Sequence, residues 1–168
     1  ATSKGKETKI VVVAASTCSS LGPPPLGEGL GFSTLVVDRD GKLLRPYTTL
    51  DGRWRLPASR EHVDPRFLLL LFAYEDKRFG THRGVDPYAL GRALRQLVGH
   101  GHMVSGASTI TMQVARLLEP RTERSFTAKL RQMARALELE HTLSKDEILG
   151  LYLSLAPYGG NLEGVRAA

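Results

Sequence analysis

The chain has 168 residues, 42% of them hydrophobic and 24% charged, which favours one globular domain and excludes a disordered protein. Its single cysteine, Cys18, excludes an internal disulfide, and no cysteine and histidine spacing typical of a zinc site is present. The net charge of +6 predicts attraction to polyanions such as nucleic acid, anionic lipid head groups or diphosphate-bearing substrates, and it does not choose among them.

Residues 1–31 are expected to form an N-terminal stub that ends in a linker. The apolar run at 10–15 is too short to span a bilayer, which takes roughly 20 residues, so it fits either a short surface strand or the remnant of a membrane anchor. Prolines at 23–25 and glycines at 27, 29 and 31 then predict a connecting segment. We therefore place a domain boundary after residue 31.

Apolar residues on both sides of Asp40-Gly41 predict a β-hairpin. Leu35–Val37 and Lys42–Leu44 would form its strands, because Asp-Gly supplies the backbone conformation that a tight turn needs. We expect this hairpin to pack beside the body of the domain.

After Trp54 the pattern changes to helices. Asp64-Pro65 and Asp86-Pro87 each join an N-cap to a proline at the first helical position, and they predict helices over about 65–75 and 87–99. Further helices are predicted over about 109–118, 125–142 and 145–156, the last opened by a capping box from Ser144 to Glu147. The fold is therefore expected to be mainly α.

The predicted helices have apolar stripes that should face the core. In helix 65–75 the stripe consists of Phe67, Leu68, Leu71 and Phe72, and in helix 145–156 it consists of Ile148, Leu149, Tyr152 and Leu153. In helix 87–99 the stripe consists of Leu90, Ala93, Leu94, Leu97 and Val98. In helix 125–142 it consists of Leu130, Met133, Ala134, Leu137 and His141.

A carboxylate pair, Glu75-Asp76, stands where helix 65–75 gives way to a glycine-punctuated loop. A carboxylate in such a place can be half buried, and burial raises a glutamate pKa toward neutrality, which suits a general base or acid. The alternative is that Glu75 only pairs with a neighbouring surface cation, such as Lys77, Arg78 or Arg83.

Three further polar segments are candidates for a site. Residues 105–113 are hydroxyl-rich and lead into a helix N-terminus that suits an anion, although an ordinary N-cap explains them equally well. Tyr152 and Tyr158 can line a sugar-binding cleft, but Tyr152 also fits the apolar core. A basic set either converges on a diphosphate or forms a solvated helix face. It comprises Arg116, Arg121, Arg124, Lys129, Arg131 and Arg135.

Together and in this order, the segments resemble the glycosyltransferase family 51 domain of bifunctional penicillin-binding proteins. The matching stretches are EDKRFGTHRGVD at 75–86, SGASTITMQVARLL at 105–118, the helix at 129–140, and SKDEILGLYLSLAPYGG at 144–160. The resemblance implies a lysozyme-like helical transferase lobe. It also implies polymerisation of lipid II into glycan strands, with inversion at the anomeric carbon and release of polyprenyl diphosphate.

The resemblance further implies roles for individual residues. Glu75 matches the general base, while Gln132 occupies the position of the family's second catalytic glutamate and Ser154 that of an asparagine. Contacts to substrate or diphosphate are implied for Asp76, His82, Gly106, Ser108, Thr109, Gln113, Arg116, Arg124 and Lys129. No metal ligand and no required cofactor are implied, although a divalent cation can assist a diphosphate leaving group.

Residues 32–168 are accordingly expected to form a peptidoglycan glycosyltransferase domain. We expect it to be truncated at its C-terminus, because Ala168 falls within an element similar to the family's fifth motif. The implied partners are lipid II, the growing lipid-linked strand, the membrane surface and other cell-wall synthesis proteins. The implied location is the outer, periplasmic face of the bacterial cytoplasmic membrane.

Two other functions stay open. One is a lysozyme-like hydrolase that uses Glu75 as an acid, and the other is a non-catalytic module that binds lipid II or membrane. Nucleic acid is not an expected partner, because the chain has no nucleic-acid-binding motif and the basic residues interleave with few aromatic ones.

Overall fold

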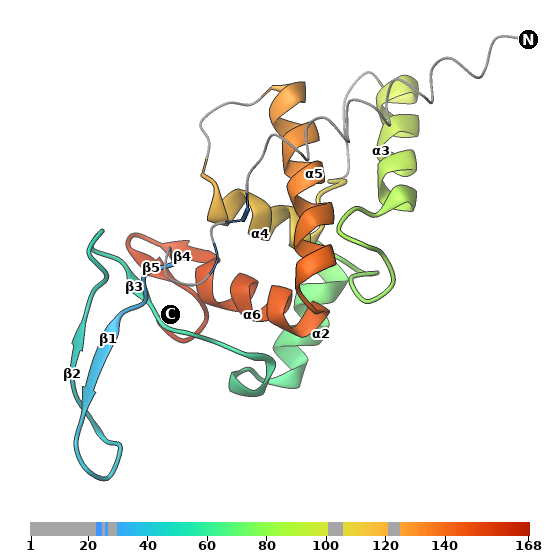
Figure 1. The fold of residues 1–168 in the computed structure, drawn as a ribbon. Coiled ribbons are helices and arrows are strands. Elements are labelled where there is room, and N and C mark those ends of the chain that lie inside the picture. Colours follow the sequence, from blue (N-terminus) through green and yellow to red (C-terminus); the bar gives the residue numbers. More distant parts are fainter. Residues whose placement is uncertain (1–22, 25, 27–29, 101–105, 121–124) are drawn as a thin grey trace, which may run out of the picture.

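The computed structural model describes residues 23–24, 26, 30–100, 106–120 and 125–168 (Figure 1). The N-terminal apolar run, Arg121 and Arg124 lie outside these residues. Within the described ranges the chain forms five α-helices, one short 3-10 helix and five short strands. The prediction of a mainly helical fold is therefore confirmed.

The helices begin where their caps predict. They are η2 (Arg60–His62), α2 (Pro65–Glu75), α3 (Pro87–His100), α4 (Ile110–Leu118), α5 (Phe126–Thr142) and α6 (Lys145–Leu155). The Asp64 carboxylate accepts the amide hydrogen of Arg66 at 2.7 Å, and Ser144 forms the capping box with Glu147. No helix in the described part of the chain is both long and apolar enough to cross a membrane.

The core lies where α4 packs against α5 and α6, with α2 closing one side (Figure 1). Its buried members include Leu68, Ile110, Val114, Leu139, Ile148, Leu149 and Leu153. Helix α4 is short, and most of its side chains are buried, so its position is set by neighbours on several sides. This fixes the N-terminus of α4, where the hydroxyl-rich segment 106–109 enters.

The buried face of α5 differs from the predicted stripe. Leu137 and His141 are exposed, whereas Arg135 is buried. Arg135 tolerates burial because its guanidinium forms ion pairs with Glu119 and with Glu138, the latter at 2.6 Å. Arg135, expected from the sequence either at a diphosphate or on a solvated helix face, is therefore part of the interior.

The predicted stripe of α3 is also wrong in part. Ala93 is buried, but Leu90 and Leu94 are exposed, with 42% and 60% of their surfaces accessible. Helix α3 continues through Gly99 to His100 and stands to one side of the other helices (Figure 1). The side chains of Leu97 and Val98 are outside the described residues.

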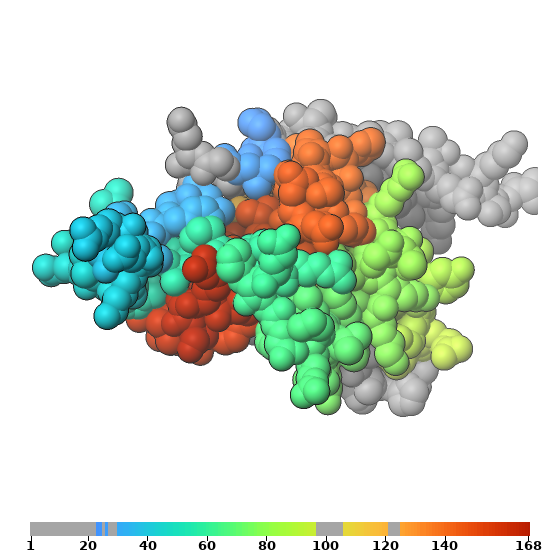
Figure 2. Space-filling model, turned by 90° about the horizontal axis from the view of Figure 1, so that it is seen from below, coloured from blue at the N-terminus to red at the C-terminus, as the bar shows by residue number. Residues whose placement is uncertain are grey.

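The predicted hairpin forms from β1 (Thr34–Val37) and β2 (Leu43–Tyr47), which pair antiparallel. Every residue of both strands is exposed, and the hairpin projects from one end of the molecule (Figures 1 and 2). The expectation that it packs beside the body is therefore wrong, because its strands contribute no buried side chain to the core.

A second small sheet has no counterpart among the predicted elements. It consists of β3 (Trp54–Arg55), β4 (Pro157–Gly159) and β5 (Leu162–Glu163), in the order β3-β5-β4. Glu163 on β5 accepts hydrogen bonds from Arg53 at 2.7 Å and from Arg55 at 2.6 Å. These contacts join the segment after the hairpin to the segment after α6.

Candidate active site

The loop that follows α2 is tied to the start of α4 by a buried acid. Each of the two Asp76 carboxylate oxygens lies 2.9 Å from His82 Nε2. The oxygen Oδ2 also accepts the amide hydrogen of Ile110 at 3.0 Å. Both Asp76 and His82 are buried. In this structure their side chains therefore organise the loop and expose little of their own surface.

A pocket of about 500 Å³ lies between the end of α2, the first half of α3 and the segment before α4. Its lining residues are Ala73, Tyr74, Glu75, Asp76, Lys77, Arg78, Asp86, Tyr88, Ala89, Arg92, Gly106, Ser108 and Thr109. The pocket thus joins two segments singled out in the sequence, 75–86 and 105–113.

Glu75 is the last residue of α2, and it carries its carboxylate at this pocket. Gln113 Nε2 donates a hydrogen bond to Glu75 Oε2 at 2.7 Å. Glu75 is exposed, so the expected half-burial is not observed. The physical reason is that α2 ends at the molecular surface, where its last carboxylate points into an open pocket.

Tyr152 on α6 lies close enough to Glu75 to sense its charge. Burial, the Glu75 carboxylate and Tyr158 together raise the pKa of the Tyr152 phenol to about 12. The phenol therefore stays protonated at neutral pH and cannot act as a base there. Tyr152 also packs against the core, as one of its two interpretations from the sequence expects, while its place in a sugar-binding cleft stays a prediction.

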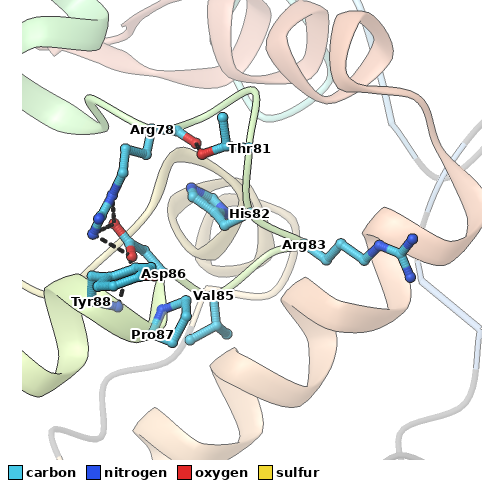
Figure 3. Close-up of a pocket in the computed structure, with 8 residues that line it drawn as sticks. All are labelled: Arg78, Thr81, His82, Arg83, Val85, Asp86, Pro87 and Tyr88. Atoms are coloured by element: carbon cyan, nitrogen blue, oxygen red, sulfur yellow. Dashed lines mark hydrogen bonds and ion pairs between the residues drawn. The ribbon is translucent and has the colours of Figure 1, made fainter.

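A smaller pocket of about 290 Å³ adjoins the first and contains His82. Figure 3 shows Arg78 and Asp86 facing each other beside Tyr88, with Arg83 directed away from them. The Arg78 guanidinium binds both oxygens of Asp86 at 2.6 to 3.0 Å. Although burial opposes it, these bonds and backbone amides of α3 keep the pKa of Asp86 below its usual value.

Lys129 on α5 reaches back to the segment before α4. Its Nζ donates to Ser108 Oγ at 2.5 Å and to Gln132 Oε1 at 3.1 Å. Burial, and secondly the nearby Arg116, lower the pKa of the Lys129 ammonium. Lys129, Arg116 and Ser108 therefore lie in one neighbourhood at the edge of the Glu75 pocket.

The structure brings most of the predicted site residues together. Glu75, Gly106, Ser108 and Thr109 line the pocket, and Gln113, Lys129 and Gln132 join them through hydrogen bonds. Thr109 is buried as the N-cap of α4. In the described ranges, no group of three or more histidine, cysteine or acidic residues is arranged to hold a metal ion.

Sequence reasoning missed two pocket residues on α3, Tyr88 and Arg92. Both follow the Asp86-Pro87 start signal, and their spacing of four residues places them on one helix face. This four-residue spacing after the helix start is the sequence signal that could have identified the two residues. The Arg78 guanidinium lies over the Tyr88 ring, 4.5 Å from its centroid, which fixes this wall of the pocket.

Ser154 has a structural role in this chain. Its buried hydroxyl donates to the Gly150 carbonyl at 2.7 Å and accepts the amide hydrogen of Ala58 at 2.9 Å. These bonds hold α6 against the segment that precedes η2. The side chain is therefore satisfied inside the protein.

Comparison with known proteins gives consistent matches. A family model described as Transglycosylase matches residues 40–168. The chain is 46% identical over 159 residues to penicillin-binding protein 1C of Escherichia coli strain K12, covering 95% of this chain and 20% of that protein.

Other relatives are penicillin-binding proteins 1A. The chain is 39% identical over 133 residues to that of Pseudomonas aeruginosa, covering 79% of this chain and 16% of the relative. It is 37% identical over 133 residues to penicillin-binding protein 1A of Escherichia coli strain K12, covering 79% of this chain and 15% of the relative. The chain thus spans a fifth or less of the length of these relatives.

Proposed function

The chain belongs to the transglycosylase family, and on this premise we propose that it is a peptidoglycan glycosyltransferase that polymerises lipid II into glycan strands. The observation that carries the proposal is the position of Glu75. Its carboxylate opens onto the large pocket and is held by Gln113, while Ser108 and Lys129 lie at the same pocket's edge. A base and a cation thus share one site.

Glu75 is proposed as the general base. Its carboxylate takes the proton from the 4-hydroxyl of the acceptor lipid II sugar, and that oxygen attacks the anomeric carbon of the lipid-linked strand. The bond from this carbon to the diphosphate breaks, its electron pair leaves with the diphosphate oxygen, and the anomeric configuration is inverted. The Gln113 amide supports this role because its hydrogen bond fixes the direction of the carboxylate.

Lys129 and Arg116 are proposed to stabilise the departing diphosphate. A diphosphate leaving group departs as an anion, so neighbouring cations stabilise its departure more than a proton would. Lys129 has the better-defined position, since its Nζ is held at Ser108 beside the helix N-terminus of α4. Arg124 stays a prediction, and Asp76 and His82 are proposed to position the loop rather than contact substrate.

Helix α3 is proposed to face the membrane that carries the substrate. Tyr88, Leu90 and Leu94 are exposed on it, with Arg92 and Arg95 among them. An amphipathic helix with exposed apolar and basic residues suits the surface of an anionic membrane. Because Tyr88 and Arg92 also line the pocket, this arrangement would set the pocket at the lipid surface, on the outer face of the cytoplasmic membrane.

The test is the incubation of the purified protein with lipid II and, separately, with finished glycan strands. We expect polymer from lipid II and expect Glu75→Gln to lower the rate at least about 100-fold. Glu61→Gln is the matched control, since Glu61 is exposed in η2 and outside the pocket. A chelator arm tests whether a divalent cation assists the diphosphate.

The other outcomes identify the competing functions. Fragmentation of finished strands without polymer would mean a lysozyme-like hydrolase. Binding of lipid II that survives Glu75→Gln, with no polymer from the parent protein, would mean a non-catalytic binding module. Other cell-wall synthesis proteins are proposed as partners and are not needed for this assay.

A further inference from the structure

Gln132 lies between Lys129 and the backbone of α4. Its Oε1 accepts a hydrogen bond from Lys129 Nζ at 3.1 Å, and its Nε2 donates to the Met112 carbonyl oxygen at 2.5 Å. Lys129 Nζ donates in turn to Ser108 Oγ. One side chain thus connects the pocket lysine to the middle of α4.

The two neighbours of Gln132 suit an amide at this position. An ammonium has only donors, so it needs an acceptor, and a carbonyl oxygen has only lone pairs, so it needs a donor. A glutamine presents one acceptor and one donor, and it meets both needs in a single orientation. A glutamate would suit Lys129 but would bring a charged oxygen against the Met112 carbonyl oxygen.

Because the Gln132 amide carries no charge, it does not neutralise the positive charges of Lys129 and Arg116. Among the residues that the structure describes, neither Lys129 nor Arg116 forms an ion pair with a carboxylate. Arg116 is close enough to Lys129 for the two cations to repel each other. Two neighbouring cations that no carboxylate of the described residues pairs with form a site that favours an anion of more than one charge.

We propose that Gln132 is a positioning residue that holds Lys129 at Ser108 without neutralising it, which keeps the diphosphate subsite fully cationic. This role depends on the function proposed above, because it takes the diphosphate as the anion that the subsite meets. A carboxylate at position 132 would instead form an ion pair with Lys129 and remove one positive charge from the subsite.

The first experiment measures the binding of inorganic pyrophosphate to the whole chain by calorimetry at pH 7.5 and low salt. We expect Gln132→Glu to weaken binding about tenfold, because the new carboxylate competes for the Lys129 ammonium. Lys129→Met should weaken it by at least as much. Leu137→Glu is the charge control, since it adds the same charge on α5 at an exposed position about 12 Å along the helix axis from Lys129.

Measuring pyrophosphate binding at several pH values separates an effect of the charge at position 132 from an effect of side-chain shape. The ion pair with Lys129 holds the pKa of the new carboxylate of Gln132→Glu below the usual value of about 4.3, so its deficit relative to the parent should shrink only as the pH falls below about 4. A purely steric defect would leave the deficit constant. Gln132→Met keeps Lys129 unneutralised but removes both hydrogen bonds, and we expect it to lose about threefold in affinity at every pH.

Several results would overturn the inference. They are equal pyrophosphate affinity in the parent and Gln132→Glu, an equal loss in Gln132→Met and Gln132→Glu, or faster lipid II polymerisation by Gln132→Glu. If Gln132→Glu does not fold, the threefold loss in Gln132→Met becomes the deciding result, and no loss there is contrary to the proposal.

Polymerisation is measured in parallel to separate the two proposals. A parent protein that polymerises lipid II but does not bind pyrophosphate would overturn the role of Gln132 and leave the proposed function standing. A parent that binds pyrophosphate with the expected variant pattern but makes no polymer would support the role of Gln132 and contradict the proposed function.

Discussion

Gly84 lies where the loop that follows Glu75 touches α5. Its φ of +78° belongs to the left-handed region, and a Cβ placed on it would lie 2.6 Å from the carbonyl oxygen of Ala136. The carbonyl oxygen of Gly84 also accepts a hydrogen bond from the Thr109 hydroxyl at 2.5 Å. One glycine therefore joins the loop, the N-cap of α4 and the backbone of α5.

Gly84→Ala is expected to destabilise the protein by roughly 2 to 4 kcal/mol, because the new methyl group meets α5 backbone atoms and the residue must keep a positive φ. Denaturant unfolding followed by circular dichroism measures this change. Gly91→Ala is the control, since Gly91 lies on α3 with nothing within 4 Å of its Cβ position. That variant should be stabilised by about 0.5 to 1 kcal/mol. Equal stability of the two variants would contradict the account of Gly84.

At the scale of single residues, the sequence could identify the polar groups but not their burial. Glu75, Ser108 and Lys129 stand in recognisable motifs and do lie at one pocket. Asp76 and His82 stand in the same motif, yet they are buried and bond to each other. Their pairing depends on the approach of the α4 N-terminus, a tertiary contact that no local pattern encodes.

Helix α3 packs only weakly against the other described elements. Asp86 is its main attachment, because the carboxylate caps the amides of Tyr88 and Ala89 and binds the Arg78 guanidinium. The predicted start of α3 therefore holds, while its predicted buried face does not. Start signals are local and can be read from sequence, but the face that a helix buries depends on neighbours that sequence does not place.

The second sheet shows the same limit. Its strands are two or three residues long, which is too short for an alternating pattern to be recognised. They exist because Glu163 and the paired arginines, Arg53 and Arg55, meet across more than a hundred residues of chain. By contrast, the β1 and β2 hairpin follows from its Asp-Gly turn, and it forms as predicted.

Asp86→Asn is expected to lower stability at pH 7 by about 1 to 2 kcal/mol, because the buried carboxylate loses its charge and its ion pair with the partly exposed Arg78 guanidinium. The folded state lowers the pKa of Asp86, so its contribution is present above the unfolded pKa of about 3.9 and is lost as the pH falls through the folded pKa. Unfolding free energies of parent and variant, measured between pH 3 and 7, should therefore converge at the acid end.

Asp40→Asn is the control for this measurement. Asp40 pairs with Arg39 at 3.8 Å, and both side chains are at least 80% exposed. An exposed pair of this kind contributes little, so the variant should stay within about 0.5 kcal/mol of the parent at every pH. A gap between parent and Asp86→Asn that persists unchanged at pH 3 would show that charge is not the source of its effect.

At the scale of the whole molecule, exposed apolar residues gather on α2, which carries Leu69 and Leu70, and at two further places. One is the hairpin, where Leu43 and Leu44 are exposed, and the other is α3, with Leu90 and Leu94. Figure 1 shows the two elements on opposite sides of the central helices. The net charge of +6 attracts the whole chain to anionic surfaces, but it does not decide which of these two places meets a membrane.

We propose that α3 rather than the hairpin meets the membrane, because Tyr88 and Arg92 belong to both the helix and the pocket wall. We therefore expect Leu94→Gln to lower binding to vesicles that contain anionic lipid about three- to tenfold, since burying a leucine in lipid is worth about 1.5 to 3 kcal/mol and part of that is retained. Leu43→Gln is the matched control, because Leu43 is 51% exposed and Leu94 is 60% exposed. Co-sedimentation with vesicles at two salt concentrations measures both variants. A larger loss for Leu43→Gln would mean that the hairpin meets the membrane instead, and the pocket would then open toward water.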